Sequence, residues 1–264
     1  MTLGVEIRNL DMSFESKSGT IHVLDDIDLS LDPGIFCSIV GPSGCGKSTM
    51  LRIIDGLIPP MAGSVTVGDT VVTGPSLDRG FVFQQFNLLP WRTVLANVEF
   101  GLENLGVQKQ ERRERAKRWL RVVDLDEFES YYPAQLSGGM QQRVGLARAL
   151  AIEPEVLLMD EPFGSVDDQT RMLLQEELLQ IWERDHKTVV FVTHDIEEAL
   201  FLSDLVVVMS PRPGRIIQKI AVPFGRPRKD TLRGDPEFSR QKQTVWEELR
   251  GGGLARPVGE VAGG

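Results

Sequence analysis

The segment from 41 to 49 reads GPSGCGKST and fits the phosphate-binding loop pattern G-x-x-x-x-G-K-[ST]. Its glycines let the backbone turn so that successive N–H groups point at phosphate oxygens, and the following helix offers its positive N-terminus to the same anion. Lys47 can reach the β- and γ-phosphates, and the Ser48 hydroxyl can bind magnesium. A simple glycine-rich turn is disfavoured, because GIFCSIV and STMLRIIDGL place a strand before the loop and a helix after it. The residues expected to contact a nucleotide are Gly41, Pro42, Ser43, Gly44, Cys45, Gly46, Lys47, Ser48 and Thr49.

Two adjacent carboxylates, Asp160 and Glu161, follow the apolar run VLLM, which predicts a buried strand. At the end of that strand Asp160 can hold magnesium through a water, and Glu161 can polarise the water that attacks the phosphate. The pair could instead cap a helix before Pro162. The first interpretation is favoured, because the four apolar residues force Asp160 into the interior, where a buried charge needs a cation.

The segment LSGGMQQR, residues 136–143, predicts the start of a helix that faces an anion. Ser137 suits the N-cap, and Gly138 and Gly139 remove side chains where a backbone must approach closely. An ordinary capped helix explains Ser137 but not two glycines in the first turn, because they lower helix stability. The phosphate-binding loop already supplies a full phosphate shell, so a second anion-facing helix start implies a nucleotide held between two copies of the chain.

Five short apolar runs, at 36–40, 81–83, 156–159, 189–192 and 205–209, predict buried strands. Four of them end in residues that can take part in chemistry, which are Gly41, Gln84, Asp160 and His194. Ligand sites in open α/β sheets gather at the carboxyl ends of strands. We therefore expect these four residues to lie close together.

The remaining segments predict two additions to this core. Runs at 5–10, 27–31, 64–67 and 70–72 alternate as in a half-exposed antiparallel sheet, and helical spacing at 93–105 and 109–123 predicts an inserted helical unit. The predicted fold class is α/β, with a mostly parallel core, an N-terminal antiparallel β subdomain and an inserted α-helical subdomain. The expected single domain divides into a core (1–85 and 153–212), a helical subdomain (86–152) and a C-terminal extension (213–264) with one helix and a disordered tail from 251.

Composition and charge exclude several classes of protein. The 264 residues are 41% apolar and 25% charged, as in ordinary globular proteins. A net charge of -9 disfavours nucleic acid as a partner. Cys37 and Cys45 are the only cysteines, and Cys45 lies in the phosphate-binding loop, so no disulfide framework is expected. The N-terminus lacks a secretory signal pattern, and no apolar stretch approaches the roughly 18 residues that span a bilayer. We therefore expect any role at a membrane to be exerted from the cytoplasmic side, through partners.

In this order and spacing, GPSGCGKST, LSGGMQQR and VLLMDEP resemble the motifs of the nucleotide-binding subunit of ATP-binding cassette (ABC) transporters, over about residues 5–215. The resemblance implies the P-loop NTPase (RecA-like) fold, with ATP and Mg²⁺ as ligands. It also implies a homodimer in which each ATP lies between the phosphate-binding loop of one subunit and the SGG helix of the other. The residues that it places on the nucleotide from the second subunit are Ser137, Gly138, Gly139, Gln141 and Asp167.

The resemblance also implies roles for single residues. Gln84 would sense magnesium and couple to the membrane partner, and Phe14 would stack on adenine, with core packing as the alternative. SVD at 165–167 replaces the more usual ALD, so this loop, which holds Asp167, can pack differently. The implied catalytic residues are Glu161, His194 and Lys47, and the implied metal ligands are Ser48, Gln84 and, through water, Asp160.

Two further segments, TGPSLDRGFVFQQFNLLPWRTVLANVEFGL and MSPRPGRI, resemble importer ATPases for nitrate, taurine and aliphatic sulfonates. The resemblance implies uptake of a small anion through a separate integral membrane permease, with a substrate-binding protein as an indirect partner. The permease would dock near Gln84 to Trp91 on the apolar LLPW, although Leu88 and Leu89 can instead pack inside the helical subdomain.

Other functions stay open. Similar sequences occur in importer ATPases for pyrimidines and riboflavin. A stand-alone ABC protein acting on DNA or ribosomes is disfavoured by the acidic charge and by the lack of a long coiled coil or a second cassette in the sequence. An inert ATP-binding protein is disfavoured because Lys47, Asp160, Glu161 and His194 are all present.

Overall fold

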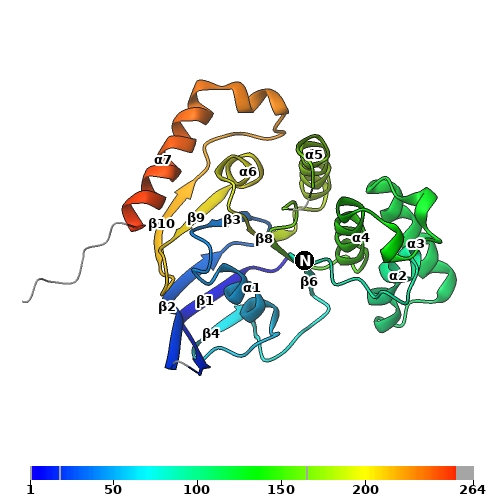
Figure 1. Ribbon diagram of the computed structural model, residues 1–264, viewed down its shortest axis with the longest axis horizontal. Helices are drawn as coiled ribbons and strands as arrows, with labels where there is room; N and C mark the ends of the chain where they lie inside the picture. Colours follow the sequence, from blue (N-terminus) through cyan, green and yellow to red (C-terminus); the bar gives the residue numbers. More distant parts are fainter. Residues whose placement is uncertain (1, 18, 165, 254–264) are drawn as a thin grey trace, which may run out of the picture.

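The computed structural model describes residues 2–17, 19–164 and 166–253, and in these ranges the chain forms two β-sheets (Figure 1). Helix α1 (Lys47–Asp55) packs between the two sheets. Ser165 and the end of the expected disordered tail, residues 254–264, lie outside the described ranges. The first three residues expected in that tail, 251–253, belong to helix α7 (Pro236–Gly253), so the tail prediction is wrong for them.

The smaller sheet is antiparallel throughout, as predicted. In spatial order its strands are β2 (Gly19–Leu31), β1 (Val5–Ser16), β4 (Ala62–Val67) and β5 (Thr70–Val71). Strands β1 and β2 are longer than expected. The β1–β2 register shifts between Ile7 and Ser13, close to Asn9 with its φ of 44°. These irregularities interrupt the period-two pattern that a sequence reading relies on.

The larger sheet carries the predicted parallel core. Its spatial order is β10 (Ile216–Ala221), β9 (Leu205–Met209), β3 (Phe36–Val40), β8 (Thr188–Val192), β7 (Val156–Asp160) and β6 (Arg79–Val82). All residues of β3, β7 and β8 are buried, because helices or the smaller sheet cover both faces. Parallel pairing therefore brings the carboxyl ends of these central strands to one edge.

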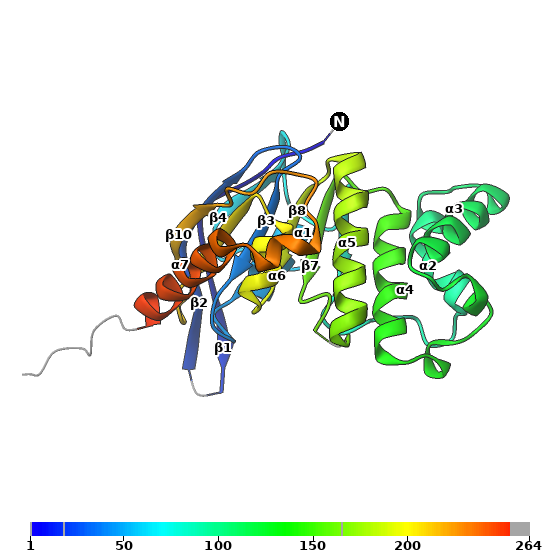
Figure 2. The same cartoon turned by 90° about the horizontal axis from the view of Figure 1, so that it is seen from above.

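The inserted helical subdomain lies at one end of the molecule, beyond the edge strand β6 (Figures 1 and 2). Its helices are α2 (Val94–Asn104), α3 (Lys109–Val122), the short η1 (Asp126–Phe128) and η2 (Pro133–Gln135), and α4 (Gly138–Ala151). The apolar face of α3 is buried at Ala116, Trp119 and Leu120. No helix within the described ranges is long and apolar enough to cross a membrane.

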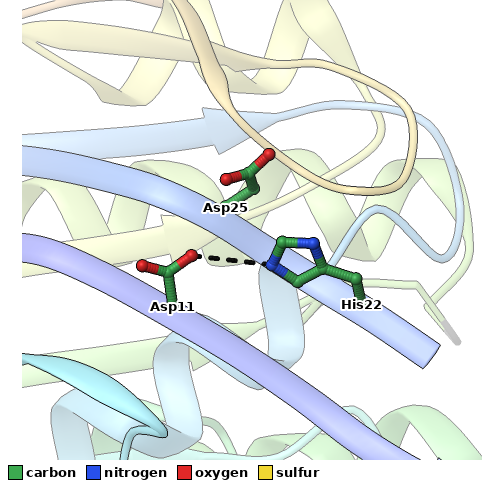
Figure 3. A group of neighbouring side chains, drawn as sticks. All are labelled: Asp11, His22 and Asp25. Atoms are coloured by element: carbon green, nitrogen blue, oxygen red, sulfur yellow. Dashed lines mark ion pairs between the residues drawn. The ribbon is translucent and has the colours of Figure 1, made fainter. Parts of the chain in front are cut away.

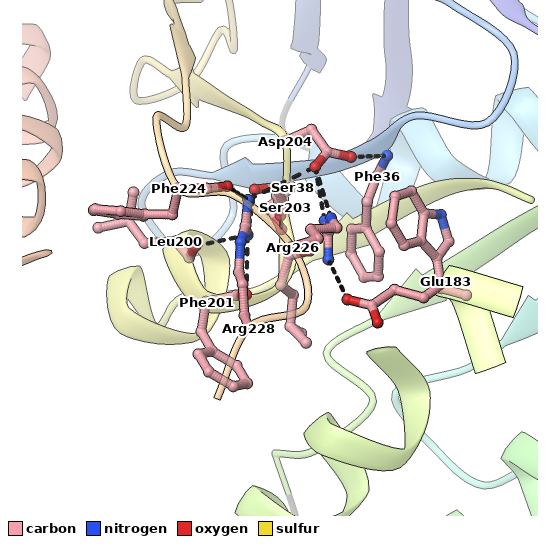
Figure 4. A network of polar contacts seen from close by, with 12 residues as sticks. Phe36, Ser38, Glu183, Leu200, Phe201, Ser203, Asp204, Phe224, Arg226 and Arg228 are labelled. Carbon is pink, nitrogen blue, oxygen red and sulfur yellow. Dashed lines mark hydrogen bonds and ion pairs between the residues drawn. The ribbon is translucent and has the colours of Figure 1, made fainter. Parts of the chain in front are cut away.

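The C-terminal extension contains more structure than the single helix expected. Helix α7 is the expected one, whereas strand β10, which pairs antiparallel with β9, and the 3-10 helix η3 (Asp230–Gly234) were not predicted. Arg226 and Arg228 hold the following segment against the core (Figure 4). Arg226 donates to the Asp204 carboxylate at 2.8 Å, and Arg228 donates to the carbonyl oxygen of Ser203 at 2.7 Å. The two remaining α-helices of the described ranges are α5 (Asp168–Asp185) and α6 (Ile196–Leu202).

Candidate functional site

A cleft of about 630 Å³ opens at the carboxyl ends of β3, β7 and β8. Its volume lies in the range of ordinary ligand sites. The expected residues Gly41, Pro42, Cys45 and Asp160 are not among the residues that line it. The residues that line the cleft are Phe14, Ile21, Val23, Ser43, Gly44, Gly46, Lys47, Ser48, Thr49, Gln84, Glu161, His194 and Arg212.

The phosphate-binding loop turns between β3 and α1 with Gly44 and Gly46 at positive φ. Gly46 has φ 107°, and a Cβ there would lie 2.6 Å from Leu24 Cδ2. Only glycine fits this position without a shift of its neighbours. Lys47 is buried, and its Nζ donates to the carbonyl oxygens of Gly41 at 2.8 Å and Pro42 at 3.1 Å. The loop therefore holds a cation at its centre, in front of the N-terminus of α1.

The carboxylate of Asp160 lies behind this loop and is 3% exposed. Burial raises the pKa of Asp160, and a hydrogen bond from the Ser48 hydroxyl, at 2.8 Å, opposes that change. A buried carboxylate beside a hydroxyl is a set of hard oxygen donors, the kind that Mg²⁺ prefers. The residues present therefore fit a magnesium ion.

Three side chains from different strand ends meet at Glu161. Its Oε2 accepts a hydrogen bond from Gln84 Nε2 at 3.2 Å and lies 3.2 Å from His194 Nδ1. Glu161 itself has φ 47°, which turns the chain sharply after β7. Gln84 and His194 thus line the same cleft as the loop, and Asp160 contacts the loop through Ser48. A carboxylate held between an amide and an imidazole can accept a proton from a water molecule.

Phe14 lines the cleft together with Ile21 and Val23, so the core-packing alternative for Phe14 is not what the structure has. Its side chain is 40% exposed on strand β1. These three residues give the cleft an apolar part, in contrast to the polar phosphate-binding loop. A planar heterocycle can pack on such a surface.

The residues expected to act from a second subunit do not line the cleft of their own chain. Ser137 caps α4, and its Oγ accepts from Met140 N at 3.3 Å. Asp167 caps α5 by accepting from Thr170 N at 3.0 Å, and Gln141 donates to the Leu136 carbonyl at 3.2 Å. The start of α4 thus lies apart from the cleft.

The two glycines at the start of α4 are not required by packing within the chain. A Cβ on Gly138 would come no closer than 3.5 Å to Phe86, and one on Gly139 no closer than 3.9 Å to Val166. Both distances are ordinary van der Waals contacts, and neither glycine has a positive φ. Within the described part of the chain, alanine would therefore fit at either position.

The apolar segment near Gln84 is split between interior and surface. Leu88 packs against the main hydrophobic core, and the backbone N–H of Leu89 donates to Asn97 Oδ1 at 2.8 Å. Trp91 is 71% exposed. The packing alternative therefore holds for Leu88, whereas Trp91 remains available at the surface.

A second group of possible metal ligands lies on the β1–β2 hairpin, where Asp11, His22 and Asp25 come together (Figure 3). His22 Nε2 is 3.5 Å from Asp11 Oδ1. Asp25 is already paired with Arg215, which follows β9 in the chain. This cation neutralises one of the three ligands, so we interpret the group as a tether between the hairpin and the segment after β9.

One buried acidic group near His194 was not anticipated. Glu198 on α6 accepts from Gln175 Nε2 at 2.8 Å, and Gln175 Oε1 in turn accepts from Arg233 Nη2 at 2.5 Å. Burial raises the pKa of Glu198 to about 7. No local sequence pattern signals this group, because its partners come from distant parts of the chain.

Glu198→Gln is expected to raise stability more at high pH than at low pH. From its ordinary value of 4.5, the pKa of Glu198 rises to about 7 on folding. The native state therefore keeps its proton while the unfolded chain loses it, and the wild type loses stability as pH rises through this window. The stabilisation by glutamine should grow by roughly 2 kcal/mol between pH 5.5 and pH 8. Urea unfolding at several pH values measures it, with the exposed Glu153→Gln as control, and a pH-independent difference contradicts it.

Comparison with known proteins identifies the family. Residues 24–164, more than half of the chain, match the family model described as ABC transporter. An uncharacterized ABC transporter ATP-binding protein of Methanocaldococcus jannaschii is 52% identical over 231 residues, covering 88% of this chain and 86% of that protein. The taurine import ATP-binding protein TauB of Rhizobium johnstonii is 44% identical over 247 residues, covering 91% of this chain and 94% of that protein.

Among solved structures, a dimeric post-hydrolysis state of the ATP-binding cassette MJ0796, bound to ADP and Pi, is similar with a TM-score of 0.76. It is 36% identical, and the match covers 84% of this chain and 100% of that one. The present chain belongs to the ABC transporter family and is an ATPase of that family. The predicted family and fold class are confirmed.

Proposed function

We propose that this chain is the ATP-binding and ATP-hydrolysing subunit of an ABC import system, which powers uptake of a small anion such as nitrate, a sulfonate or taurine through a separate permease. The observation that carries the hydrolytic part is the meeting of Gln84, His194 and Glu161 beside Lys47. The similarity to a taurine import ATP-binding protein over 91% of the chain supports the class of cargo.

In this proposal the triphosphate lies along the phosphate-binding loop, and Phe14 contacts the adenine. Lys47 leaves the carbonyl oxygens of Gly41 and Pro42 and donates to the β- and γ-phosphates instead. Glu161 accepts a proton from the attacking water, and His194 holds the Glu161 carboxylate from the other side. Most of the rate gain then comes from charges that are already in place around the γ-phosphate.

A magnesium ion would be held by Ser48, by Asp160 through water, and by Gln84. When bound, it supplies positive charge that neutralises the phosphate oxygens. The chain prepares for this charge by burying Asp160 with the Ser48 hydroxyl as its hydrogen-bond donor. Gln84 contacts Glu161 as well, so a change in the position of Glu161 can move the loop that carries Gln84.

A second copy of the chain completes the site in this proposal. Ser137, Gly138, Gly139, Gln141 and Asp167 of one copy would face the nucleotide of the other. The support is that nothing within the described chain requires glycine at 138 or 139, although two glycines lower helix stability. A close external approach accounts for them. The dimeric state of the MJ0796 cassette is consistent with this arrangement.

The permease would dock beside Gln84, with Trp91 as the exposed apolar anchor. Gln84 lies only seven positions before Trp91 in the sequence, so contact at Trp91 can move Gln84 relative to Glu161. The chain would then act as a peripheral subunit on the cytoplasmic face of the membrane, with a substrate-binding protein as an indirect partner. Pyrimidine or riboflavin import and a non-transport role remain the alternatives.

Cells whose own copy carries Glu161→Gln are expected to lose ATP-driven uptake of the true cargo. Uptake of labelled taurine, an alkanesulfonate, nitrate, a pyrimidine and riboflavin should be compared with that of cells carrying the wild-type chain. Loss confined to one of the three anions supports the proposal. Loss confined to the pyrimidine or riboflavin contradicts the proposed cargo, and unchanged uptake of all five contradicts a transport role for these compounds.

A further inference from the structure

The segment MSPRPGRI, noted in the sequence only for its resemblance, has a structural relation to the phosphate-binding loop. Strands β9 and β3 are parallel neighbours, with Val208 beside Val40. The loop after β9 and the phosphate-binding loop after β3 therefore emerge side by side at the same edge of the sheet. Arg212, in the loop after β9, lines the nucleotide cleft.

The loop after β9 is held by contacts on two sides. Toward the hairpin, Gly214 N donates to Val23 O at 2.9 Å, and Asp25 N donates to Gly214 O at 3.1 Å. Arg215 adds the ion pair with Asp25 described above. Toward the phosphate-binding loop, a Cβ on Gly214 would lie 2.1 Å from the carbonyl oxygen of Cys45. The backbone that carries Arg212 is thus packed directly between strand β2 and the nucleotide site.

From this position two N–H groups of the Arg212 guanidinium bind one carbonyl oxygen of the phosphate-binding loop. Its Nε and Nη2 both donate to the carbonyl oxygen of Gly44, at 3.1 and 2.9 Å. Gly44 has φ 76°, and a Cβ there would lie 3.2 Å from Arg212 Nη2, so glycine leaves room for the guanidinium. A guanidinium has five N–H donors. Within the described part of the chain, Gly44 is the acceptor found for them, which leaves donors for a ligand.

We propose that Arg212 is a further residue of the nucleotide site, which braces the phosphate-binding loop and adds a second basic side chain to the cleft beside Lys47. A planar trans peptide points its C=O and N–H in opposite directions. Holding the Gly44 carbonyl on Arg212 therefore directs the N–H of Cys45 into the loop, where it lies 3.3 Å from Pro42 O. That side of the loop is where phosphate oxygens bind.

The charge of Arg212 acts on the same ligand. Arg212 and Lys47 are the arginine and the lysine among the residues that line the cleft, and the carboxylate side chain of Glu161 lines it as well. A nucleoside di- or triphosphate carries several negative charges, so a second cation at the opening favours it over an uncharged nucleoside. The inference rests on the ATP-binding cleft and concerns binding of phosphate groups, whereas hydrolysis itself depends on Glu161.

Arg212→Ala is expected to weaken binding of Mg-ATP and Mg-ADP by about tenfold, the value of one charge-assisted hydrogen bond at the low end of its range. Titration of the full chain with each nucleotide measures this. In steady-state ATPase assays KM should rise by a similar factor, while kcat at saturating ATP stays within about twofold. Arg212→Lys keeps the charge but loses the paired guanidinium donors to Gly44. Its affinities for the nucleotides should therefore fall between those of Arg212→Ala and the wild type.

Lys219→Ala is the matched control. Lys219 is an exposed cation on β10 that also donates to a backbone carbonyl, Asp28 O at 3.0 Å, but it does not line the cleft. Its nucleotide affinities should equal those of the wild type. The melting temperature of each variant without nucleotide reports folding separately.

Wild-type affinity for both nucleotides in Arg212→Ala overturns the proposal, and wild-type affinity in Arg212→Lys overturns the bracing role. A fall in kcat with KM unchanged also contradicts it, because that result places Arg212 in the hydrolytic step. If Lys47→Ala abolishes binding while Arg212→Ala leaves it intact, this inference fails and the assignment of the cleft stands.

Discussion

Replacing Lys47 with alanine is expected to weaken Mg-ATP binding by at least about 100-fold. The Lys47 ammonium lies at the centre of the phosphate-binding loop, and its present acceptors are two backbone carbonyl oxygens that a phosphate would replace. Hydrogen bonds to a charged group contribute roughly 1.5–3 kcal/mol each, and 1.4 kcal/mol corresponds to a tenfold change in affinity. Two such bonds to the phosphates account for the expected loss.

Titration of the purified variant with Mg-ATP and Mg-ADP measures this loss. Lys219→Ala, which removes a surface cation outside the cleft, should bind both nucleotides like the wild type. Lys47 is buried, so the melting temperature without nucleotide must be compared as well. A folded Lys47→Ala protein that binds Mg-ATP with wild-type affinity refutes the assignment of the cleft.

Glu161→Gln is expected to lower ATP turnover by about 1,000-fold while Mg-ATP affinity stays within about threefold of wild type. A positioned general base contributes roughly 10²–10⁴-fold to a rate, and glutamine cannot accept the proton. The amide has the shape of the carboxylate, and its oxygen can still accept from Gln84 Nε2. Binding and catalysis should therefore separate.

Single-turnover ATPase assays test this separation, because they isolate hydrolysis from product release. Glu153→Gln makes the same chemical change at an exposed position outside the cleft lining and should have wild-type activity. Turnover within tenfold of wild type in the Glu161→Gln protein would move the role of general base to another residue.

Strong periodic patterns allowed most of the fold to be predicted. The fully apolar runs at β3, β7 and β8 are recognisable because both faces of the larger sheet are covered. Strand β10 was missed because it is an edge strand whose Gln218 and Lys219 are exposed, so it lacks such a run. The second half of β1 and the first part of β2, which pair with each other, were missed because the register shifts there.

The residues of the candidate site also fall into those that the sequence predicts and those that it does not. Residues that belong to compact motifs or end apolar strands could be placed from the sequence, and the contacts of Glu161 with Gln84 and His194 agree with that placement. Arg212 was missed because its contact with Gly44 spans 168 positions in the chain. This contact depends on which strands are neighbours in the larger sheet. Glu198 was missed for a related reason, because its burial depends on α5 and on Arg233 from the C-terminal extension.

The central claim is that two copies of the chain share each ATP, and the Glu161→Gln protein allows a direct test because it should bind ATP without consuming it. The double variant with Gly139→Asp is the matched control. An acidic residue in the first turn of a helix is stabilised by the positive end of the helix dipole. A Cβ at 139 would meet no atom closer than Val166, at 3.9 Å. The added carboxylate should therefore leave the fold intact and repel the triphosphate of a second copy.

Sedimentation velocity of both proteins, with and without saturating Mg-ATP, is the decisive measurement. The account predicts that the Glu161→Gln protein changes from monomer to dimer when Mg-ATP is added, whereas the Glu161→Gln, Gly139→Asp protein stays monomeric. A Glu161→Gln protein that binds Mg-ATP and remains monomeric, or a double variant that dimerises equally well, would contradict the shared site.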